Sequence, residues 1–274
     1  MTASFAGLSL ARPLIMGIIN VTPDSFSDGG LALDPAEAIA RGRMLLDDGA
    51  DILDVGGEST RPGAEPVPVE VELERVLPVV RGLAGGGAVV SMDTRKAQVM
   101  EAALAAGAAI INDVTALTGD RRSLEVAAGN GAAVVLVHMR GVPGTMQDDP
   151  RYDDAAKEVF GYLSGRVAVC EAAGIERSRI AVDPGIGFGK TVDHNTGILG
   201  RLDLYRELGC ALLIGVSRKT FIARLSKGEP PCQRLAGSLA AALAGVARGV
   251  HILRVHDVAE TRQALDVWEA IGGT

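Results

Sequence analysis

Short, mainly apolar runs recur along the chain, and most of them are followed by residues with helical spacing of apolar positions. Short runs in which apolar residues do not alternate with polar ones are typical of parallel strands that are buried on both faces. Eight runs fit this description, at residues 14–19, 52–55, 89–93, 110–113, 133–139, 180–183, 212–216 and 251–256.

The segments between these runs predict amphipathic helices. Asp34 and Pro35 supply an N-cap and a first-turn proline for the first helix, which is expected to end near Gly49. Further helices are predicted at 69–83, 95–106, 123–128, 153–173 and 194–208, with a short helix after 216, an apolar helix within 235–250 and a closing helix from 258 onward. The apolar segment 235–250 is too short and too interrupted to span a bilayer, so we expect a buried helix there.

Eight strands, each followed by helix, predict an α/β fold, a single (β/α)8 TIM barrel formed by residues 1–274. The length is close to the ~250 residues typical of such barrels, and no linker-like segment interrupts the pattern. A doubly wound open sheet is the alternative, because alternation alone does not prove that the sheet closes.

Composition and charge limit the range of functions that we expect. Hydrophobic residues make up 47% of the chain and aromatic residues only 3%, as expected where helices pack on parallel strands through small branched side chains. The net charge of −7 argues against a nucleic-acid or membrane-surface role, since both need a basic face. Three widely spaced cysteines show no metal or disulfide pattern, and the N-terminus shows no signal peptide, so we expect a reduced, cytoplasmic protein.

Polar and ionisable residues follow nearly every predicted strand. They are Asn20, Thr60 in the second loop, Asp93, Asn112, His138, Asp183, Lys219, Arg254 and His256. In a barrel the C-terminal ends of all strands meet at one face, which is where ligands bind. So many such groups on one rim are hard to explain by folding alone, and they predict a binding or catalytic site.

Two chemical sets are present among these strand-end residues. Two carboxylates, an amide and an ammonium suit a flat heterocycle with donor and acceptor edges, and these are Asp93, Asn112, Asp183 and Lys219. Neutral donors and a fixed positive charge suit a phosphate or diphosphate, and these are Asn20, Thr60, Arg254 and His256. The order Arg-Val-His puts the side chains of Arg254 and His256 on one face of a strand.

Several of these residues could have a structural role in place of a binding or catalytic one. Asp93 is also a candidate helix cap, because a helix is expected to begin just after it. Asn112 and Asp113 are compatible with an ordinary turn. Two histidines and two rim cations are compatible with structural or solvated roles, namely His138, His251, Lys190 and Arg218.

The stretch from Asp183 to Lys190 contains three glycines and one aromatic residue. Glycines allow a close backbone approach to a ligand, so a phosphate cradle is the first interpretation, although a glycine-rich turn alone is a weak signal. The phosphate-binding candidates lie on other strands, however. We therefore expect Asp183 to bind the heterocycle and Phe188 to face a second substrate.

Two long motifs resemble the signatures of the dihydropteroate synthase family, the folate-biosynthesis enzymes that sulfonamides inhibit. They are residues 16–30 and 49–63, and the shorter segments 217–219 and 254–257 complete the pattern. The resemblance extends from Ile15 to about Leu265. Departures are small, with Thr115-Ala116 where the family often has Ser-Gly, and Thr220 where serine is common.

The resemblance implies a (β/α)8 homodimer that joins 6-hydroxymethyl-7,8-dihydropterin diphosphate to 4-aminobenzoate and releases diphosphate, with Mg²⁺ as cofactor. The implied pterin contacts are Asp93, Asn112, Asp183 and Lys219, and the implied diphosphate contacts are Thr60, Arg254 and His256. The implied aminobenzoate contacts are Phe26, Pro62, Phe188 and Thr220, and Asn20 is the implied Mg²⁺ ligand. The residues expected to act in catalysis are Asp93, Asp183, Lys219, Arg254 and His256.

An SN1-like displacement is consistent with these residues, because an electron-rich pterin delocalises positive charge once diphosphate has left. Loops 21–30 and 57–64 are expected to close and exclude water. Three other functions stay open on the sequence. They are a pterin-dependent methyltransferase with a corrinoid partner, an aldolase that uses Lys219 as a Schiff-base nucleophile, and a catalytically silent pterin-binding relative.

Overall fold

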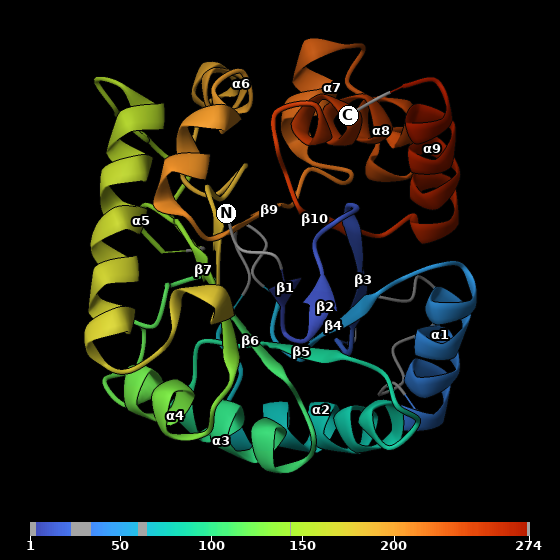
Figure 1. Cartoon of the computed structure of the whole chain (residues 1–274), viewed down its shortest axis with the longest axis vertical. Coiled ribbons are helices and arrows are strands. Elements are labelled where there is room, and N and C mark those ends of the chain that lie inside the picture. The colour runs from blue at the N-terminus through green and yellow to red at the C-terminus, as the bar shows by residue number, and fades with distance from the viewer. Residues whose placement is uncertain (1–3, 23–33, 60–64, 143, 273–274) are drawn as a thin grey trace.

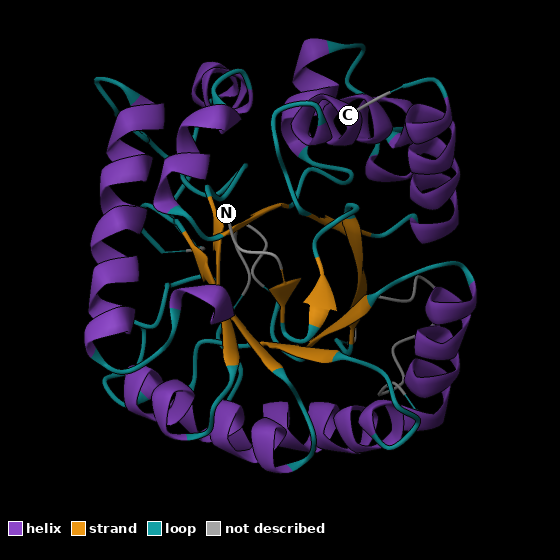
Figure 2. Cartoon of the chain, viewed as in Figure 1, coloured by secondary structure: helices purple, strands orange, loops and turns teal. Residues whose placement is uncertain are grey.

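The computed structural model describes residues 4–22, 34–59, 65–142 and 144–272. Eight parallel strands close into a barrel in the order β10-β3-β4-β5-β6-β7-β8-β9. Figure 1 shows these strands as a central ring surrounded by helices, and Figure 2 separates the two layers by colour. The strands are β3 (Leu14–Asn20), β4 (Ile52–Gly56), β5 (Val90–Asp93), β6 (Ile110–Asp113), β7 (Ala133–Val137), β8 (Ile180–Asp183), β9 (Ala211–Ile214) and β10 (Ile252–Val255). The predicted barrel is confirmed, and the open sheet is wrong.

The helices lie outside the barrel near their predicted positions. They are α1 (Pro35–Asp47), α2 (Val69–Ala84), α3 (Ala97–Ala105), α4 (Ser123–Gly129), α5 (Ala155–Ala172), α6 (Val192–Leu199), α7 (Thr220–Leu225), α8 (Leu235–Val246) and α9 (Val258–Ala270). The predicted helix 194–208 is instead α6 followed by a 3-10 turn, Leu202–Leu208. The predicted N-cap of α1 is confirmed, since the Asp34 carboxylate accepts a hydrogen bond from the Ala36 N–H at 2.9 Å.

Side-chain alternation along the strands creates two cores and the site. Outward residues such as Leu53 and Val55 on β4 pack against the helices in the larger core. Inward residues near the strand beginnings, such as Ile52, form a small apolar core inside the barrel. At the C-terminal ends the inward positions become polar, as at Asp54 and Asp93. The same register that buries the apolar residues therefore brings the polar ones together inside the barrel mouth.

A short N-terminal hairpin, which the apolar pattern did not predict, completes the inner core. It pairs β1 (Ser4–Phe5) with β2 (Leu8–Ser9) through Ala6 and Gly7, both with positive φ, as type I′ hairpin turns require. Phe5 is fully buried in the inner apolar core. The hairpin lies in the middle of the strand ring in Figure 1. Because Phe5 belongs to the same core as Leu14 and Ile52 at the strand beginnings, the hairpin fills the end of the barrel opposite the polar residues.

The apolar segment that begins at Leu235 is helix α8, which is 12 residues long. Within the described ranges, none of the helices has the length and apolar character needed to cross a membrane.

Candidate active site

Four inward side chains from four strands form a connected polar cluster inside the barrel. Arg254 on β10 donates from Nε to Asp54 Oδ2 at 2.6 Å and from Nη2 to Asp93 Oδ2 at 2.7 Å. Asn112 on β6 donates from Nδ2 to the same oxygen of Asp54 at 3.0 Å. Asp54 is completely buried, so its charge depends on these two donors. Because residues far apart in sequence converge here, the cluster holds β4, β5, β6 and β10 in one arrangement.

The electrostatics of this cluster follow from burial. Burial raises the pKa of Asp93 to about 7, and the nearby Asp54 carboxylate adds to the rise, while the Arg254 guanidinium opposes it. Burial also disfavours the charge of Arg254, but the two carboxylates outweigh this effect and raise the pKa of the guanidinium. The cluster therefore combines one permanent cation with a carboxyl group that exchanges a proton near neutral pH.

Asp183 and Lys219 lie beside this cluster on the β8 and β9 side of the barrel mouth. Asp183 Oδ1 accepts the Gly185 N–H at 2.7 Å, and burial raises the pKa of this carboxyl. Lys219 immediately precedes α7, and its Nζ lies 4.1 Å from the centroid of the Phe188 ring. Burial lowers the pKa of Lys219 to about 8, against the opposing effect of Asp183. A carboxylate, an ammonium and an aromatic face are thus grouped at one edge of the site.

The glycine-rich stretch after β8 turns sharply and packs against the end of β7. Gly185 has a φ of +68°, and an added Cβ would lie 1.9 Å from the carbonyl oxygen of His138. Gly189 has a φ of +62°, with an added Cβ 2.3 Å from the carbonyl oxygen of Arg140. These glycines serve backbone packing. The first interpretation of a phosphate cradle is therefore unnecessary to explain them.

His256 and Arg218 occupy the loops that follow β10 and β9. His256 Nδ1 lies 3.0 Å from Ser217 Oγ, which also accepts the backbone N–H of His256 at 3.2 Å. Arg218 has a φ of +59° and pairs with Asp257, with its Nε 3.0 Å from Oδ2. The two loops are therefore tied together by consecutive contacts. Arg218 is not a solvated rim charge, and Asp257 stands at the α9 N-cap position without a side-chain cap bond.

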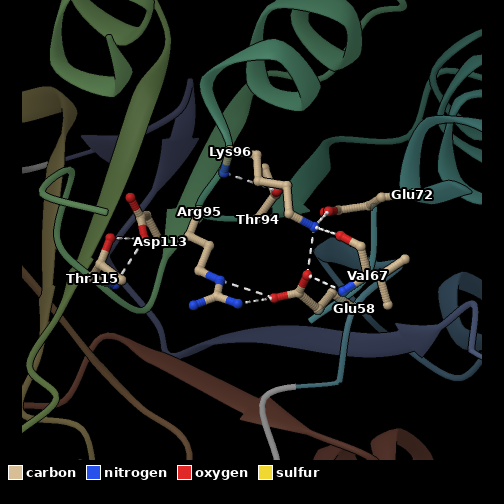
Figure 3. A network of polar contacts seen from close by, with 8 residues as sticks. All are labelled: Glu58, Val67, Glu72, Thr94, Arg95, Lys96, Asp113 and Thr115. Carbon is tan, nitrogen blue, oxygen red and sulfur yellow. Dashed lines mark hydrogen bonds and ion pairs between the residues drawn. The ribbon is translucent and has the colours of Figure 1, made fainter. Parts of the chain in front are cut away.

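A polar network anchors the base of the second loop (Figure 3). The Glu58 carboxylate receives Arg95 Nε at 2.9 Å and the Val67 N–H at 3.0 Å, and it pairs with the ammonium of Lys96. Lys96 Nζ also lies 2.5 Å from the fully buried Glu72. The network fixes the residues on both sides of the undescribed segment 60–64 against the start of α3.

The predicted site residues fall into three groups, which lie inside the barrel mouth, near it, or outside the described residues. The structure brings together five of them inside the barrel mouth, namely Asp93, Asn112, Asp183, Lys219 and Arg254. Phe188 is half-buried beside Lys219, Thr220 is exposed at the first turn of α7, Asn20 is half-buried at the end of β3, and His256 lies just beyond β10. Phe26, Thr60 and Pro62 lie outside the described residues.

The structure also decides which of these residues have the structural role that the sequence left open. Asp93 points to Arg254 and does not cap α3, where the Ala97 N–H is accepted by Asp120. Asp113 does form a turn, because its carboxylate accepts the N–H groups of Thr115 and Leu117. His251 is structural, with Nδ1 accepting the Leu212 N–H at 3.0 Å. Lys190 is not a solvated charge, since it is only 3% exposed.

Asp54 is the main residue of the cluster that was not among the site residues predicted from the sequence. A signal for it was present, because a carboxylate interrupts the apolar strand at the same parity as inward-facing Ile52. Ser217, which holds His256, was named only as part of a motif. The local sequence does not predict the roles of Glu58 and Lys96, because these roles depend on contacts between segments that are far apart in the sequence.

Among the described residues, no group of three or more His, Cys, Asp or Glu side chains is arranged so that it could hold a metal ion. Asn20 offers a neutral amide oxygen at the C-terminal end of β3. Mg²⁺ prefers oxygen ligands and is often held by one or two protein groups together with substrate phosphates. The residues present therefore fit a Mg²⁺ ion that arrives with a diphosphate.

Comparisons with known proteins agree with this arrangement. Residues 16–256 match the family described as pterin binding enzyme. A dihydropteroate synthase from Neisseria meningitidis serogroup B is 51% identical over 271 residues, which cover 97% of this chain and 95% of that protein. The similarity therefore extends over nearly the whole length of both proteins.

Solved structures show the same likeness. The Xanthomonas albilineans dihydropteroate synthase with 4-aminobenzoic acid has a TM-score of 0.91 and 49% identity, covering 97% of this chain and 96% of that one. The enzyme from the same organism in complex with 7,8-dihydropteroate has a TM-score of 0.88 and 46% identity, with the same coverage of both chains.

Proposed function

Because this chain belongs to the pterin-binding enzyme family, among its dihydropteroate synthases, we propose that it joins 6-hydroxymethyl-7,8-dihydropterin diphosphate to 4-aminobenzoate. The products are 7,8-dihydropteroate and diphosphate, which makes the chain a transferase of folate biosynthesis. The observation that supports this most strongly is the convergence of Asp93, Asn112, Asp183, Lys219 and Arg254 inside one barrel mouth. These groups match a planar, amino-substituted heterocycle in both charge and hydrogen-bonding capacity.

The pterin lies, in this proposal, across the mouth between the β5–β6 and β8–β9 sides. Asp183 accepts hydrogen bonds from the amino edge of the ring, because a carboxylate binds adjacent N–H donors in bidentate fashion. Asn112 adds one donor and one acceptor, and its orientation is set by Asp54 at 3.0 Å. Lys219 donates to the carbonyl or ring-nitrogen edge. Asp93, held by Arg254, faces the developing charge near the exocyclic methylene.

The diphosphate binds at the outer end of the mouth. Thr60, Arg254 and His256 supply donors, and Ser217 sets the ring orientation of His256. Two of the five N–H donors of the Arg254 guanidinium hold Asp54 and Asp93. When bound, Mg²⁺ held by Asn20 and the diphosphate oxygens would neutralise leaving-group charge.

Aminobenzoate binds beside the pterin, in a pocket with walls from Phe26, Pro62, Phe188 and Thr220. Support comes from the position of Phe188, whose ring lies against the ammonium of Lys219. Thr220 is at the first turn of α7, where backbone N–H groups favour a carboxylate. We therefore propose that the aromatic ring of aminobenzoate lies next to Phe188, with its amino group toward the pterin methylene.

An SN1-like displacement suits this geometry. The bond between the methylene carbon and the diphosphate oxygen breaks first, and the diphosphate leaves with the electron pair. Asp93 and Asp183 stabilise the cationic pterin electrostatically. The neutral aromatic amine then forms the carbon–nitrogen bond, and the proton that its nitrogen loses passes to the released diphosphate, so no strong general base is required.

The competing functions fit the site less well. A Schiff-base aldolase needs a deprotonated lysine amine, and burial does lower the pKa of Lys219 to about 8. However, Lys219 lies beyond the end of β9 beside an aromatic ring and does not project from within the strand. A pterin methyltransferase has no need for the Arg254-Val255-His256 segment that ends β10.

We further propose that residues 1–274 form one domain, that the protein works as a homodimer and that it acts in the cytoplasm. Support for the dimer comes from the apolar helix α8, on which Ala236, Ala240 and Ala244 are exposed, together with Leu225 on the neighbouring α7, which is 61% exposed. Cys170 and Cys210 are buried, and burial raises the pKa of both thiols, consistent with cysteines that stay reduced. Light scattering after size exclusion tests the dimer.

Diphosphate release tests the proposed reaction. The purified protein is mixed with dihydropterin diphosphate, Mg²⁺ and 4-aminobenzoate, and diphosphate is followed by a coupled enzyme assay. Release that depends on all three additions is expected. A folded protein that releases no diphosphate would defeat the proposal, and borohydride trapping with a carbonyl substrate would then test the aldolase.

A further inference from the structure

Two proposed substrate contacts, Asp183 at the end of β8 and Phe188 in the segment between β8 and α6, depend on a backbone that is intrinsically loose. Gly185, Gly187 and Gly189 all have positive φ, with values of +68°, +84° and +62°. Glycine has more conformations to lose on ordering than any other residue. A segment with this composition needs contacts of its own to keep one shape, and the proposed reaction does not supply them.

Lys190 supplies these contacts from within the segment. Its Nζ donates to the carbonyl oxygens of Gly185 at 2.8 Å and Phe188 at 3.0 Å, so it closes the turn across the two residues between them. The same atom lies 2.9 Å from His138 Nδ1 and 3.3 Å from the His138 carbonyl oxygen. One buried amino group therefore joins the turn after β8 to the end of β7.

His138 is built to be the acceptor in this contact. It is 5% exposed, its ring meets Tyr162 edge to face at 5.0 Å, and burial lowers the pKa of the imidazole to about 3. The ring is therefore neutral, and Nδ1 accepts from Lys190 when the amino group is charged. Burial lowers the pKa of Lys190 to about 7. The charged amine has three N–H donors, for the two carbonyl oxygens and Nδ1, and the neutral amine keeps two donors for the carbonyl oxygens and offers its lone pair to an Nδ1–H.

The positions of the substrate contacts follow from this turn. Asp183 Oδ1 is fixed by the Gly185 N–H at 2.7 Å, so the placement of Gly185 orients the carboxylate. The second carbonyl that Lys190 holds belongs to Phe188 itself, and the Phe188 ring covers Lys219, with Nζ 4.1 Å from the ring centroid. On the outer side, Asn195 accepts the Gly187 N–H at 2.8 Å, but it contacts neither carbonyl.

We infer that Lys190 is a positioning residue, whose amino group holds Asp183 and Phe188 in the geometry that binds the pterin and the aminobenzoate. The inference rests on the proposed function. Lys190 itself does not touch the reacting atoms. Its removal should therefore affect binding at the β8 side of the mouth and spare the diphosphate side, where Arg254 and His256 have separate supports.

The test compares the wild type with Lys190→Met, which keeps the length of the side chain and removes its donors. Lys157→Met is the matched control, because Lys157 is a 73% exposed lysine on α5 that loses the same charge. Far-UV circular dichroism verifies folding. The readouts are the KM for 4-aminobenzoate, the affinity for 6-hydroxymethylpterin and the affinity for inorganic diphosphate with Mg²⁺, the last two by calorimetry.

We expect Lys190→Met to raise the aminobenzoate KM and weaken pterin binding by about 10-fold or more each, as for a lost buried hydrogen-bond donor. Diphosphate affinity should stay within about 2-fold of wild type, a change smaller than one typical hydrogen bond contributes. The Lys157→Met control should match the wild type throughout. If Lys190→Met does not fold, Lys190→Gln takes its place, and the same pattern is expected at smaller size because glutamine retains two N–H donors.

Two results would overturn the inference. One is unchanged aminobenzoate KM and pterin affinity in the folded variant. The other is a parallel loss of diphosphate affinity, which indicates general damage to the barrel mouth. An inactive wild type would instead count against the proposed reaction, so the two failures are distinguishable.

Discussion

Replacing Arg254 by methionine tests whether the buried polar cluster is arranged as described. Arg254 balances two carboxylates, with bonds of 2.6 Å to Asp54 and 2.7 Å to Asp93, and Asp54 is fully buried. Breaking a buried ion pair from one side typically costs about 3–5 kcal/mol, because it leaves an uncompensated charge. We expect a loss of this size in the free energy of unfolding of Arg254→Met, and a loss of pterin and diphosphate binding with it.

The penalty should depend on pH, and its sign follows from Asp93. The pKa of Asp93 is about 7 in the folded chain, above its ordinary value of 3.8. Between these two pH values the folded state keeps a proton that the unfolded state has lost, so the free energy of unfolding falls as pH rises from about 4 to about 7. The Arg254 guanidinium limits this rise in pKa. Without it, the loss continues to higher pH, by up to about 1.4 kcal/mol per pH unit.

Urea unfolding followed by circular dichroism at pH 6.5 and pH 8.5 measures both effects. Arg122→Met is the control, because Arg122 forms an exposed pair with Glu101 at 3.2 Å, of a kind that contributes about 0–1 kcal/mol. The penalty of Arg254→Met should exceed the control and be larger at pH 8.5. A penalty no larger than that of the control, or one that is the same at both pH values, would refute the reasoning.

Three further variants test separate parts of the site. Lys219→Ala should weaken 6-hydroxymethylpterin binding in calorimetry by about 10-fold or more, as for a lost charged hydrogen bond, and equal affinity would reject its proposed role. Gly185→Ala should destabilise the fold by about 2 kcal/mol or more, whereas Gly161→Ala, at an open helix position, should be neutral or stabilising in the same urea titration. Arg218→Gly should be about 1 kcal/mol more stable than Arg218→Ala, because only glycine tolerates a φ of +59° without strain; the reverse order would contradict this.

The barrel and its polar mouth were predictable because they depend on local patterns. Apolar runs predicted the strands, and a polar residue at the end of a strand had to lie on the catalytic face once the sheet closed. Asp93, Asn112 and Asp183 were found in this way. Asp54 obeys the same alternation but lies two residues deeper along its strand, where a buried charge is not expected unless a partner such as Arg254 lies beside it.

Other features depend on contacts between segments that the sequence does not connect. Lys190 looked like a solvated cation, because nothing in its neighbours reveals that His138, 52 positions earlier, lies 2.9 Å away. The N-terminal hairpin is too short for a periodic signal, and Phe5 gains its place only when the barrel exists. The anchoring of Glu58 by Lys96 likewise depends on the approach of α3 to the second loop.

The most direct test of the central claim is the formation of 7,8-dihydropteroate itself. The purified chain is incubated with dihydropterin diphosphate, 4-aminobenzoate and Mg²⁺, and the product is identified by mass spectrometry, with each substrate omitted in turn and with Asp183→Ala as the site control. Dihydropteroate should form only with both substrates, and Asp183→Ala should form far less of it. Absence of dihydropteroate from the folded wild-type protein, or undiminished synthesis by Asp183→Ala, would contradict the account.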